Sequence, residues 1–338
     1  MIKDAIKKIK GKDHLSEAEM QVVFEEIMTG KTTEPEIEQL LVCLSQKGEA
    51  IEEITGAARA MRKFVRRIDV SSDVVLDTCG TGGDKSGTFN ISTVAAFVVA
   101  GCGITVAKHG NRSVSSACGS ADLLEALGVD IQLGPEALKR CLEKVGIAFL
   151  FAPNLHPAMR YAMPVRKKLK MRTIFNILGP LTNPAFATHQ FMGVFDEKLV
   201  KPLAHVLANL GTRHAIVAHG LDGLDELTTT TESLACEFKD GNFKSFRINP
   251  QDFGIKTANP QDLKGSDCNF NAEIALEILK GVPGPKQDIV LLNSGCAIYV
   301  ADKARDLGQG IDLARESIDS GRALGKLEAL KKFSKSNI

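Results

Sequence analysis

The chain of 338 residues carries 42 Lys and Arg against 41 Asp and Glu, and its net charge is +1. This balance gives no basic surface for nucleic acid and no attraction to an acidic membrane, so we expect neither partner. No apolar run reaches the length of a membrane span, and the amino terminus lacks the apolar core of a signal peptide, so we expect a cytoplasmic protein. The eight cysteines form no CxxC pair and no zinc-spaced cluster with histidine.

The first part of the chain, up to about residue 70, has the pattern of a helical domain. Residues 16–19, Ser-Glu-Ala-Glu, are typical of a capping box at a helix start, and a second helix is predicted after Thr33. Apolar residues recur at helical spacing in both segments: Val22, Val23, Ile27, Met28, Ile37, Leu40, Leu41 and Leu44. These stripes fit either a core inside the chain or an interface with a second copy of it.

From residue 71 onward, short apolar strands alternate with helices, which is typical of an α/β domain. A β-branched run at residues 74–76 leads into Gly80, Gly82 and Gly83, and residues 90–93 then begin an apolar helix. Glycines let the backbone turn sharply and expose its N–H groups, so residues 77–84, here called the first cradle, can bind phosphate. The spacing matches neither the Walker loop nor GxGxxG, and a plain glycine-rich turn explains it equally well.

A second loop of this kind, residues 108–116, follows a strand predicted at residues 103–107 and is here called the second cradle. Lys108 and Arg112 bring positive charge, and Ser115, Ser116 and Ser120 open the next helix. Charge, hydroxyls and free N–H groups at a helix start favour a phosphate site. The alternative is that Arg112 forms a surface ion pair and the serines only cap the helix. Two cradles together predict a ligand with two phosphate-bearing ends.

Further strands are predicted at residues 148–151, 190–195 and 215–218. Residues 239–242, Lys-Asp-Gly-Asn, are a hairpin signal between strands at 235–238 and 243–248, and the last third of the chain returns to helices. The predicted fold class is α/β, with a small all-helical N-terminal domain and a large α/β domain around a mainly parallel central sheet. Asp225 and Glu226 follow the strand at 215–218, where open α/β sheets bind ligands, although composition alone favours ordinary loop acids.

The two cradles and the helix start between them resemble anthranilate phosphoribosyltransferases. The similarity continues in order along nearly the whole chain, through motifs at residues 56–61, 80–84, 90–93, 108–113, 165–167, 172–184 and 219–226. It implies the nucleoside phosphorylase/phosphoribosyltransferase type of fold. The small domain would comprise residues 1–70, joined by a segment near 172–187, and the large substrate-binding domain residues 71–338. The resemblance also implies a homodimer and substrates that meet at the hinge between the domains.

The activity implied by the resemblance is transfer of the 5-phosphoribosyl group from phosphoribosyl diphosphate (PRPP) to the amino group of anthranilate. Diphosphate is released, and the product serves tryptophan biosynthesis. The implied cofactor is Mg²⁺, held by Ser92, Asp225 and Glu226, and such a set suits an ion that prefers a few carboxylates plus phosphate oxygens. The nitrogen of anthranilate is neutral at physiological pH, so we expect no catalytic general base.

The site residues implied by the resemblance lie around both cradles. The PRPP contacts are Gly80, Gly83, Asp84, Thr88, Asn90, Ile91, Ser92, Thr93, Lys108, His109, Gly110, Asn111, Arg112, Ser113, Val114, Ser115, Ser116 and Ser120. The anthranilate contacts are Gly80, Asn111 and Arg166, and a guanidinium can meet the carboxylate of that substrate and lie against its ring. His156 and Tyr161 are expected to line the route for anthranilate.

Two rival functions fit parts of the pattern. A pyrimidine nucleoside phosphorylase shares this type of fold and a similar phosphate site, but it has no need of Asp225 and Glu226 for magnesium. An inactive relative that binds nucleic acid would show a basic face and would have lost magnesium or anthranilate residues. Ser92, Asn111, Arg166 and the two acids are all present, so we favour the transferase.

Overall fold

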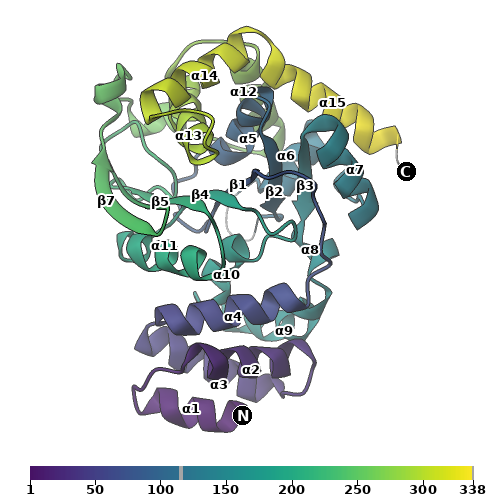
Figure 1. Ribbon diagram of the computed structural model, residues 1–338, viewed down its shortest axis with the longest axis vertical. Helices are drawn as coiled ribbons and strands as arrows, with labels where there is room; N and C mark the ends of the chain where they lie inside the picture. The colour runs from purple at the N-terminus through teal and green to yellow at the C-terminus, as the bar shows by residue number, and fades with distance from the viewer. Residues whose placement is uncertain (114–116, 337–338) are drawn as a thin grey trace.

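Two hydrophobic cores organise the chain in the computed structural model, which describes residues 1–113 and 117–336. One core lies between the sheet and the helices on one of its faces. The other fills the helical part and continues to the opposite face of the sheet. Figure 1 shows the helical part below and the α/β part above, with the carboxyl-terminal helix across the top.

The helical part combines N-terminal helices with two helices from the middle of the chain. It consists of α1 (Ile2–Lys10), α2 (Glu17–Met28), α3 (Glu34–Lys47), α4 (Ile51–Lys63), α9 (Met163–Leu169) and α10 (Phe175–Leu181). The predicted capping box is present, since the Glu19 backbone N–H donates to Ser16 Oγ at 3.3 Å and Ser16 N–H to Glu19 Oε2 at 2.8 Å. The apolar stripes of α2 and α3 are buried inside the chain, except for Val22, which is 41% exposed.

The sheet has seven strands in the order β3-β2-β1-β4-β5-β6-β7. The first five are parallel, and β6 and β7 form an antiparallel edge, which confirms the mainly parallel α/β fold. The strands are β1 (Val75–Gly80), β2 (Thr105–Gly110), β3 (Ile147–Phe151), β4 (His189–Gly193), β5 (His214–Gly220), β6 (Ser233–Lys239) and β7 (Asn242–Ile248). The predicted hairpin joins β6 to β7, with positive φ at Asp240 and Gly241.

Helices cover both faces of the sheet, and alternation along the strands serves both cores. Met192 and Val217 face the core shared with α11 (Val200–Asn209) and the helical part, whereas Phe191 and Ile216 face the other core. The second face and the β3 edge are covered by α5 (Ile91–Gly101), α6 (Ser120–Ala126), α7 (Pro135–Val145), α12 (Cys268–Leu279), α13 (Pro285–Val300), α14 (Leu307–Asp319) and α15 (Arg322–Ser336). Short helices lie in the connections between the longer elements: α8 (Ala152–Leu155), η1 (Pro157–Tyr161), η2 (Glu197–Leu199), η3 (Pro250–Phe253) and η4 (Pro260–Leu263).

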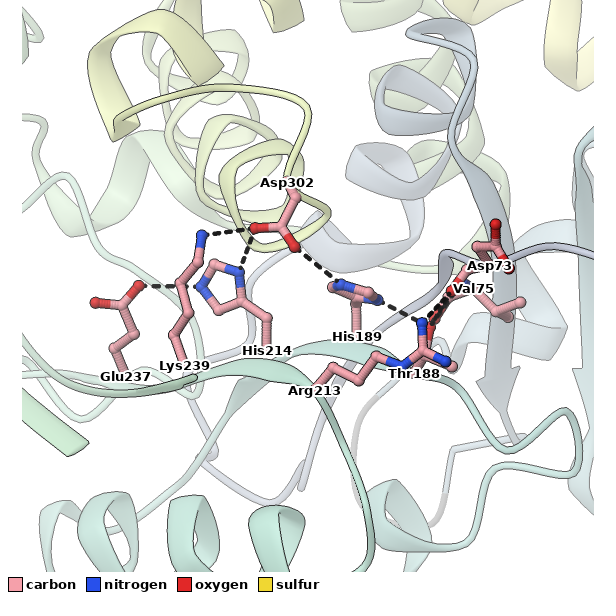
Figure 2. A network of polar contacts seen from close by, with 9 residues as sticks. All are labelled: Asp73, Val75, Thr188, His189, Arg213, His214, Glu237, Lys239 and Asp302. Atoms are coloured by element: carbon pink, nitrogen blue, oxygen red, sulfur yellow. Dashed lines mark hydrogen bonds and ion pairs between the residues drawn. The ribbon is translucent and has the colours of Figure 1, made fainter. Parts of the chain in front are cut away.

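A polar network closes the amino ends of β4 and β5 (Figure 2). Asp302, after α13, faces His214 Nδ1 at 3.0 Å, His189 Nε2 at 3.2 Å and Lys239 Nζ at 2.6 Å. His214 Nε2 lies 3.0 Å from Glu237 Oε1. Burial alone would raise the pKa of Asp302, but hydrogen bonds from Lys239 and His214 bring it down to about 2. The network secures the end of the sheet opposite the cradles.

Candidate active site

The carboxyl ends of β1, β4 and β5 bring the first cradle and the two predicted acids together. The order of the strands reverses between β1 and β4, which is where open α/β sheets bind ligands. A Cβ atom at Gly80 would overlap Asp225 Oδ2, and one at Gly193 would overlap the Asp225 carbonyl oxygen. Glycine at both strand ends therefore allows the loop with Asp225 and Glu226 to lie directly against the cradle.

The two acids are held by backbone donors of the first cradle and of α5. Gly82 N–H donates to Asp225 Oδ2 at 2.6 Å, and Ser92 N–H donates to Glu226 Oε1 at 3.1 Å. Burial raises the pKa of Asp225 well above its usual value, and the charges of Asp84 and Glu226 raise it further. Burial also raises the pKa of Glu226 to about 7. A cation beside two such carboxyl groups favours the ionised form of both.

The donor atoms near Asp225 are of the chemical type that magnesium prefers. Carboxylates of Asp84, Asp225 and Glu226 and the hydroxyl of Ser92 are hard oxygen donors, as Mg²⁺ prefers. Within residues 1–113 and 117–336, no three His, Cys, Asp or Glu side chains are arranged as a metal cluster.

The Lys108 side chain points to the first cradle, whereas the sequence pattern led us to expect its charge in the second. Its ammonium donates to the Thr78 carbonyl at 2.5 Å and to Ser92 Oγ at 3.3 Å, and only 3% of the residue is exposed. The reason is that Lys108 lies inside β2, so the strand directs its side chain toward β1 and α5. Burial lowers its pKa, and the charge of Asp77 opposes that effect.

In the second cradle, the ion pair considered as the alternative for Arg112 is present. Its Nη1 lies 2.8 Å from Asp122 Oδ1 and 2.6 Å from Glu125 Oε2, both on α6. Ser120 Oγ donates to the Asn111 carbonyl at 3.1 Å. Gly110 is required here because a Cβ would meet Ser120 and Phe149. The predicted contacts Val114, Ser115 and Ser116 lie outside the described residues.

The remaining PRPP candidates lie at the start of α5 and just before it. Asn90 Nδ2 donates to the Cys118 carbonyl at 2.9 Å, which joins this helix start to the segment between the second cradle and α6. Ile91 and Thr93 are each only 1% exposed, so both residues are buried at the start of α5. Thr88 lies on the loop that leads to α5, where its hydroxyl contacts Ser86 Oγ at 3.1 Å.

Of the predicted anthranilate contacts, Arg166 comes from the helical part, whereas Gly80 ends β1 and Asn111 directly follows β2. Arg166 lies on α9 with its guanidinium 5.1 Å from the centre of the Phe175 ring, and burial lowers its pKa. The Tyr161 ring packs against Gly30, where a Cβ would collide with it. His156 and His109 face each other, with 3.1 Å between their Nε2 atoms.

Sequence reasoning missed several polar residues beneath and beside the cradles. Arg172 Nη2 donates to the Gly83 carbonyl, and its guanidinium lies 3.8 Å from the centre of the Phe195 ring. Asp77 and Asn183 form a hydrogen bond of 2.7 Å in the buried space between the cradles and α10. The signal for Asp77 was a charged residue inside an otherwise apolar strand pattern.

Similarity to known proteins defines the class to which the chain belongs. Two family models match: "Glycosyl transferase family, helical bundle domain" over residues 3–65 and "Glycosyl transferase family, a/b domain" over residues 72–324. The fold and the site thus define a glycosyl transferase. No helix in the described ranges is long and apolar enough to cross a membrane.

Full-length relatives narrow this class. Anthranilate phosphoribosyltransferase of Desulfatibacillum aliphaticivorans is 50% identical over 337 residues and 100% of both chains. The enzyme of Desulforamulus reducens is 52% identical over 334 residues, 99% of this chain and 97% of the relative. The crystal structure of the enzyme from Thermus thermophilus superposes with a TM-score of 0.93 at 44% identity, covering 98% of this chain and 99% of that one. The chain belongs to the anthranilate phosphoribosyltransferase family.

A more distant solved structure carries ligands. Anthranilate phosphoribosyltransferase from Saccharomyces cerevisiae, in complex with PRPP and Mg, superposes with a TM-score of 0.91 at 27% identity, covering 99% of this chain and 98% of that one. The family resemblance and the fold class predicted from the sequence are confirmed.

Proposed function

We propose that the chain transfers the 5-phosphoribosyl group of PRPP to the amino group of anthranilate, with release of diphosphate, as a step of tryptophan biosynthesis. Full-length identity of about 50% to enzymes of this name supports the reaction. The observation that carries the proposal in this molecule is the contact of Asp225 with the first cradle through Gly82 N–H. A nucleoside phosphorylase does not require acids at that position.

The first cradle and the start of α5 bind the diphosphate end of PRPP in this proposal. Gly82 and Gly83 have positive φ, a conformation that glycine adopts readily and that allows the tight turn of the cradle. Ser92, Asp225 and Glu226 would hold Mg²⁺, as a PRPP complex with Mg in the yeast relative supports. Bound magnesium supplies positive charge that stabilises the departing diphosphate. Lys108 adds a second positive charge beside Ser92.

The second cradle binds the 5-phosphate end. Asn111, Arg112, Ser113 and Ser120 supply polar groups around the carboxyl end of β2. Arg112 stays attached to α6 through Asp122 and Glu125, so its charge is held at the edge of the cradle. Val114, Ser115 and Ser116, which lie outside the described residues, are further contacts of PRPP in the proposal.

Anthranilate approaches from the helical part. Arg166 meets its carboxylate, and Gly80 and Asn111 are the other two contacts of anthranilate in this proposal. Displacement at the anomeric carbon develops positive charge on the ribose ring, as in glycoside hydrolysis. The protein binds the neutral amine on the face opposite the diphosphate, and this orientation lowers the barrier to transfer. We assign no general base, and His109 and His156 take no part in proton transfer.

We further propose that the protein is a cytoplasmic homodimer. The buried stripes of α2 and α3 are unavailable for an interface. We therefore place the dimer interface on the outer face of α1 and α3. Pro35, Val42 and Cys43 line a hollow on that face together with polar residues. Light scattering at micromolar concentration tests the dimer, and a substitution Val42→Arg should yield monomers.

Product analysis tests the reaction itself. The purified chain is mixed with PRPP, Mg²⁺ and anthranilate, and the product is identified by mass together with the diphosphate released. One diphosphate for each N-(5-phosphoribosyl)anthranilate supports the proposal. Turnover of pyrimidine nucleosides with inorganic phosphate, in the absence of transfer to anthranilate, would replace it with the phosphorylase reaction.

A further inference from the structure

Three neighbouring strands of the sheet reach one short stretch of chain, residues 179–183, through buried polar side chains. Asn183 Nδ2 donates to Asp77 Oδ2 on β1 at 2.7 Å, and Gln190 Nε2 on β4 donates to the Pro180 carbonyl at 2.7 Å. His109 Nδ1 on β2 lies 3.1 Å from the Gly179 carbonyl. The four side chains involved are between 0% and 7% exposed. The stretch is therefore held to the cradle-bearing strands at three points.

The same stretch is attached to the helical part from its other side. It includes the end of α10, whose apolar residues belong to the helical core. Arg62 Nε on α4 donates to the Leu181 carbonyl at 2.8 Å. Residues 179–183 thus form the junction between the helices that carry Arg166 and the strands that carry the cradles.

Asp77 and Asn183 form the most completely paired contact in this junction. Asp77 Oδ1 accepts from His109 N–H at 3.1 Å, and Oδ2 also accepts from Cys79 Sγ at 3.3 Å. Asn183 Nδ2 donates further to the Ala107 carbonyl at 2.8 Å. The Asn183 oxygen accepts from Ala185 N–H at 2.8 Å. Burial raises the pKa of Asp77, whereas the charge of Lys108 and the hydrogen bonds from Asn183, His109 and Cys79 lower it and favour the ionised carboxylate.

We propose that Asn183, through its hydrogen bond to Asp77, is a positioning residue of the transfer reaction. It fixes α10 and α9 against the cradles, so that the amine lies in line with the anomeric carbon. The inference rests on the proposed function, because it needs one substrate on the cradles and the other at Arg166. Arg166 is linked to α10 by the contact of its guanidinium with Phe175. Small errors of placement reduce rates strongly in such reactions.

The first test replaces Asn183 with alanine. Because PRPP binds on the cradles, Asn183→Ala should leave the KM for PRPP and for anthranilate within about threefold of wild type while kcat falls between about tenfold and about a hundredfold. The control is Asp302→Asn, which weakens a polar network at the opposite end of the sheet and should leave kcat unchanged at 25 °C. Circular dichroism confirms that each variant is folded under the assay conditions.

A second variant, Asn183→Asp, reads out the hydrogen bond directly. At pH 8 two carboxylates would face each other, whereas at lower pH the new acid binds a proton and can donate to Asp77. The ratio of its kcat to that of wild type should therefore increase as the pH falls from 8 to 6, and the ratio for Asn183→Ala should stay constant. Lys108, His109 and Cys79, which also surround Asp77, are present in all three proteins and cancel in the ratio.

The outcomes separate the two proposals. A wild-type protein without transfer activity would reject both the function and the positioning role. An active wild type, combined with Asn183→Ala within twofold of its kcat, would reject the positioning role alone. A constant ratio for Asn183→Asp across the pH range would also reject it, and this test remains decisive if the alanine variant does not fold.

Discussion

The Nε2 atoms of His109 and His156 lie 3.1 Å apart, and the surrounding contacts define which of them donates. His109 Nδ1 faces the Gly179 carbonyl, which can only accept, so this nitrogen carries the proton of the neutral ring. His109 Nε2 then accepts, and His156 Nε2 donates to it. Burial lowers the pKa of His109 well below its usual value, and it lowers the pKa of His156 to about 4. The pair is therefore neutral in the folded protein.

We predict that this pair makes the protein sensitive to acid. Groups whose pKa is lower in the folded than in the unfolded state contribute their full stability above the unfolded value of about 6.5, and lose it as the pH falls toward the folded value. For His156 the loss should reach about 1–3 kcal/mol between pH 6.5 and about 4. His156→Gln keeps a donor but does not titrate, so denaturant unfolding should show a shallower pH dependence. An identical slope in both proteins would contradict the pairing.

The like charges of Asp225 and Glu226 predict a conflict between stability and function. Because burial raises both pKa values, the folded state is disfavoured as the pH rises from about 4 through about 7. Neutral isosteres remove this cost, so Asp225→Asn with Glu226→Gln should raise the melting temperature at pH 8 by roughly 2–5 °C. The same variant should lose at least about a hundredfold in kcat, because the charges that hold magnesium are gone. An equal gain of stability at pH 5 and at pH 8 would contradict the claim that ionisation of the two buried acids destabilises the folded state.

Magnesium should stabilise the wild-type protein in the presence of PRPP. Binding to the folded state alone raises the melting temperature in proportion to the logarithm of ligand concentration. Scanning fluorimetry with PRPP and rising Mg²⁺ should show such an increase for wild type and little or none for the double variant. Ca²⁺ and a chelator serve as comparisons. Equal shifts in both proteins would assign the metal to other ligands.

Two glycines allow a matched test of the close approach at the first cradle. Gly193→Ala places a methyl group against the Asp225 backbone, which cannot rotate away, so we expect a loss of at least about 2 kcal/mol of stability and severe loss of turnover. Gly179→Ala is the control, since no atom lies within 4 Å of its Cβ position. It should be neutral or stabilising by up to about 1 kcal/mol. Equal behaviour of the two variants in urea unfolding would refute the packing argument.

Much of the fold follows from local patterns along the chain. Alternating strands and helices after residue 71 predict the parallel sheet, and the capping box at Ser16 predicts the start of α2, because both signals depend on neighbours in sequence. The apolar stripes on α2 and α3 have two possible partners in the sequence, since a stripe does not show whether it packs within its own chain or against another. Their partners include α9 and α10, which lie more than a hundred residues away.

The functional site likewise has features that follow from local sequence and others that depend on tertiary contacts. Glycines and hydroxyls at Gly80 and Ser92 mark a cradle in the sequence, because the backbone conformation is a local property. The direction of Lys108 and the ion pair of Arg112 depend on tertiary neighbours, and the sequence alone supported two interpretations of Arg112. The hydrogen bond between Asp77 and Asn183 joins residues 106 positions apart, so only the folded chain reveals it.

The most direct measurement is the fluorescence of anthranilate after the chain is mixed with PRPP and Mg²⁺. The protein has no tryptophan and two tyrosines, so its own emission interferes little. The account predicts a decrease that requires all three components and that Asp225→Ala with Glu226→Ala reduces severely. Unchanged fluorescence with folded wild-type protein that binds PRPP would contradict the proposed acceptor. A near-normal rate in the double variant at limiting magnesium would contradict the role of the two acids.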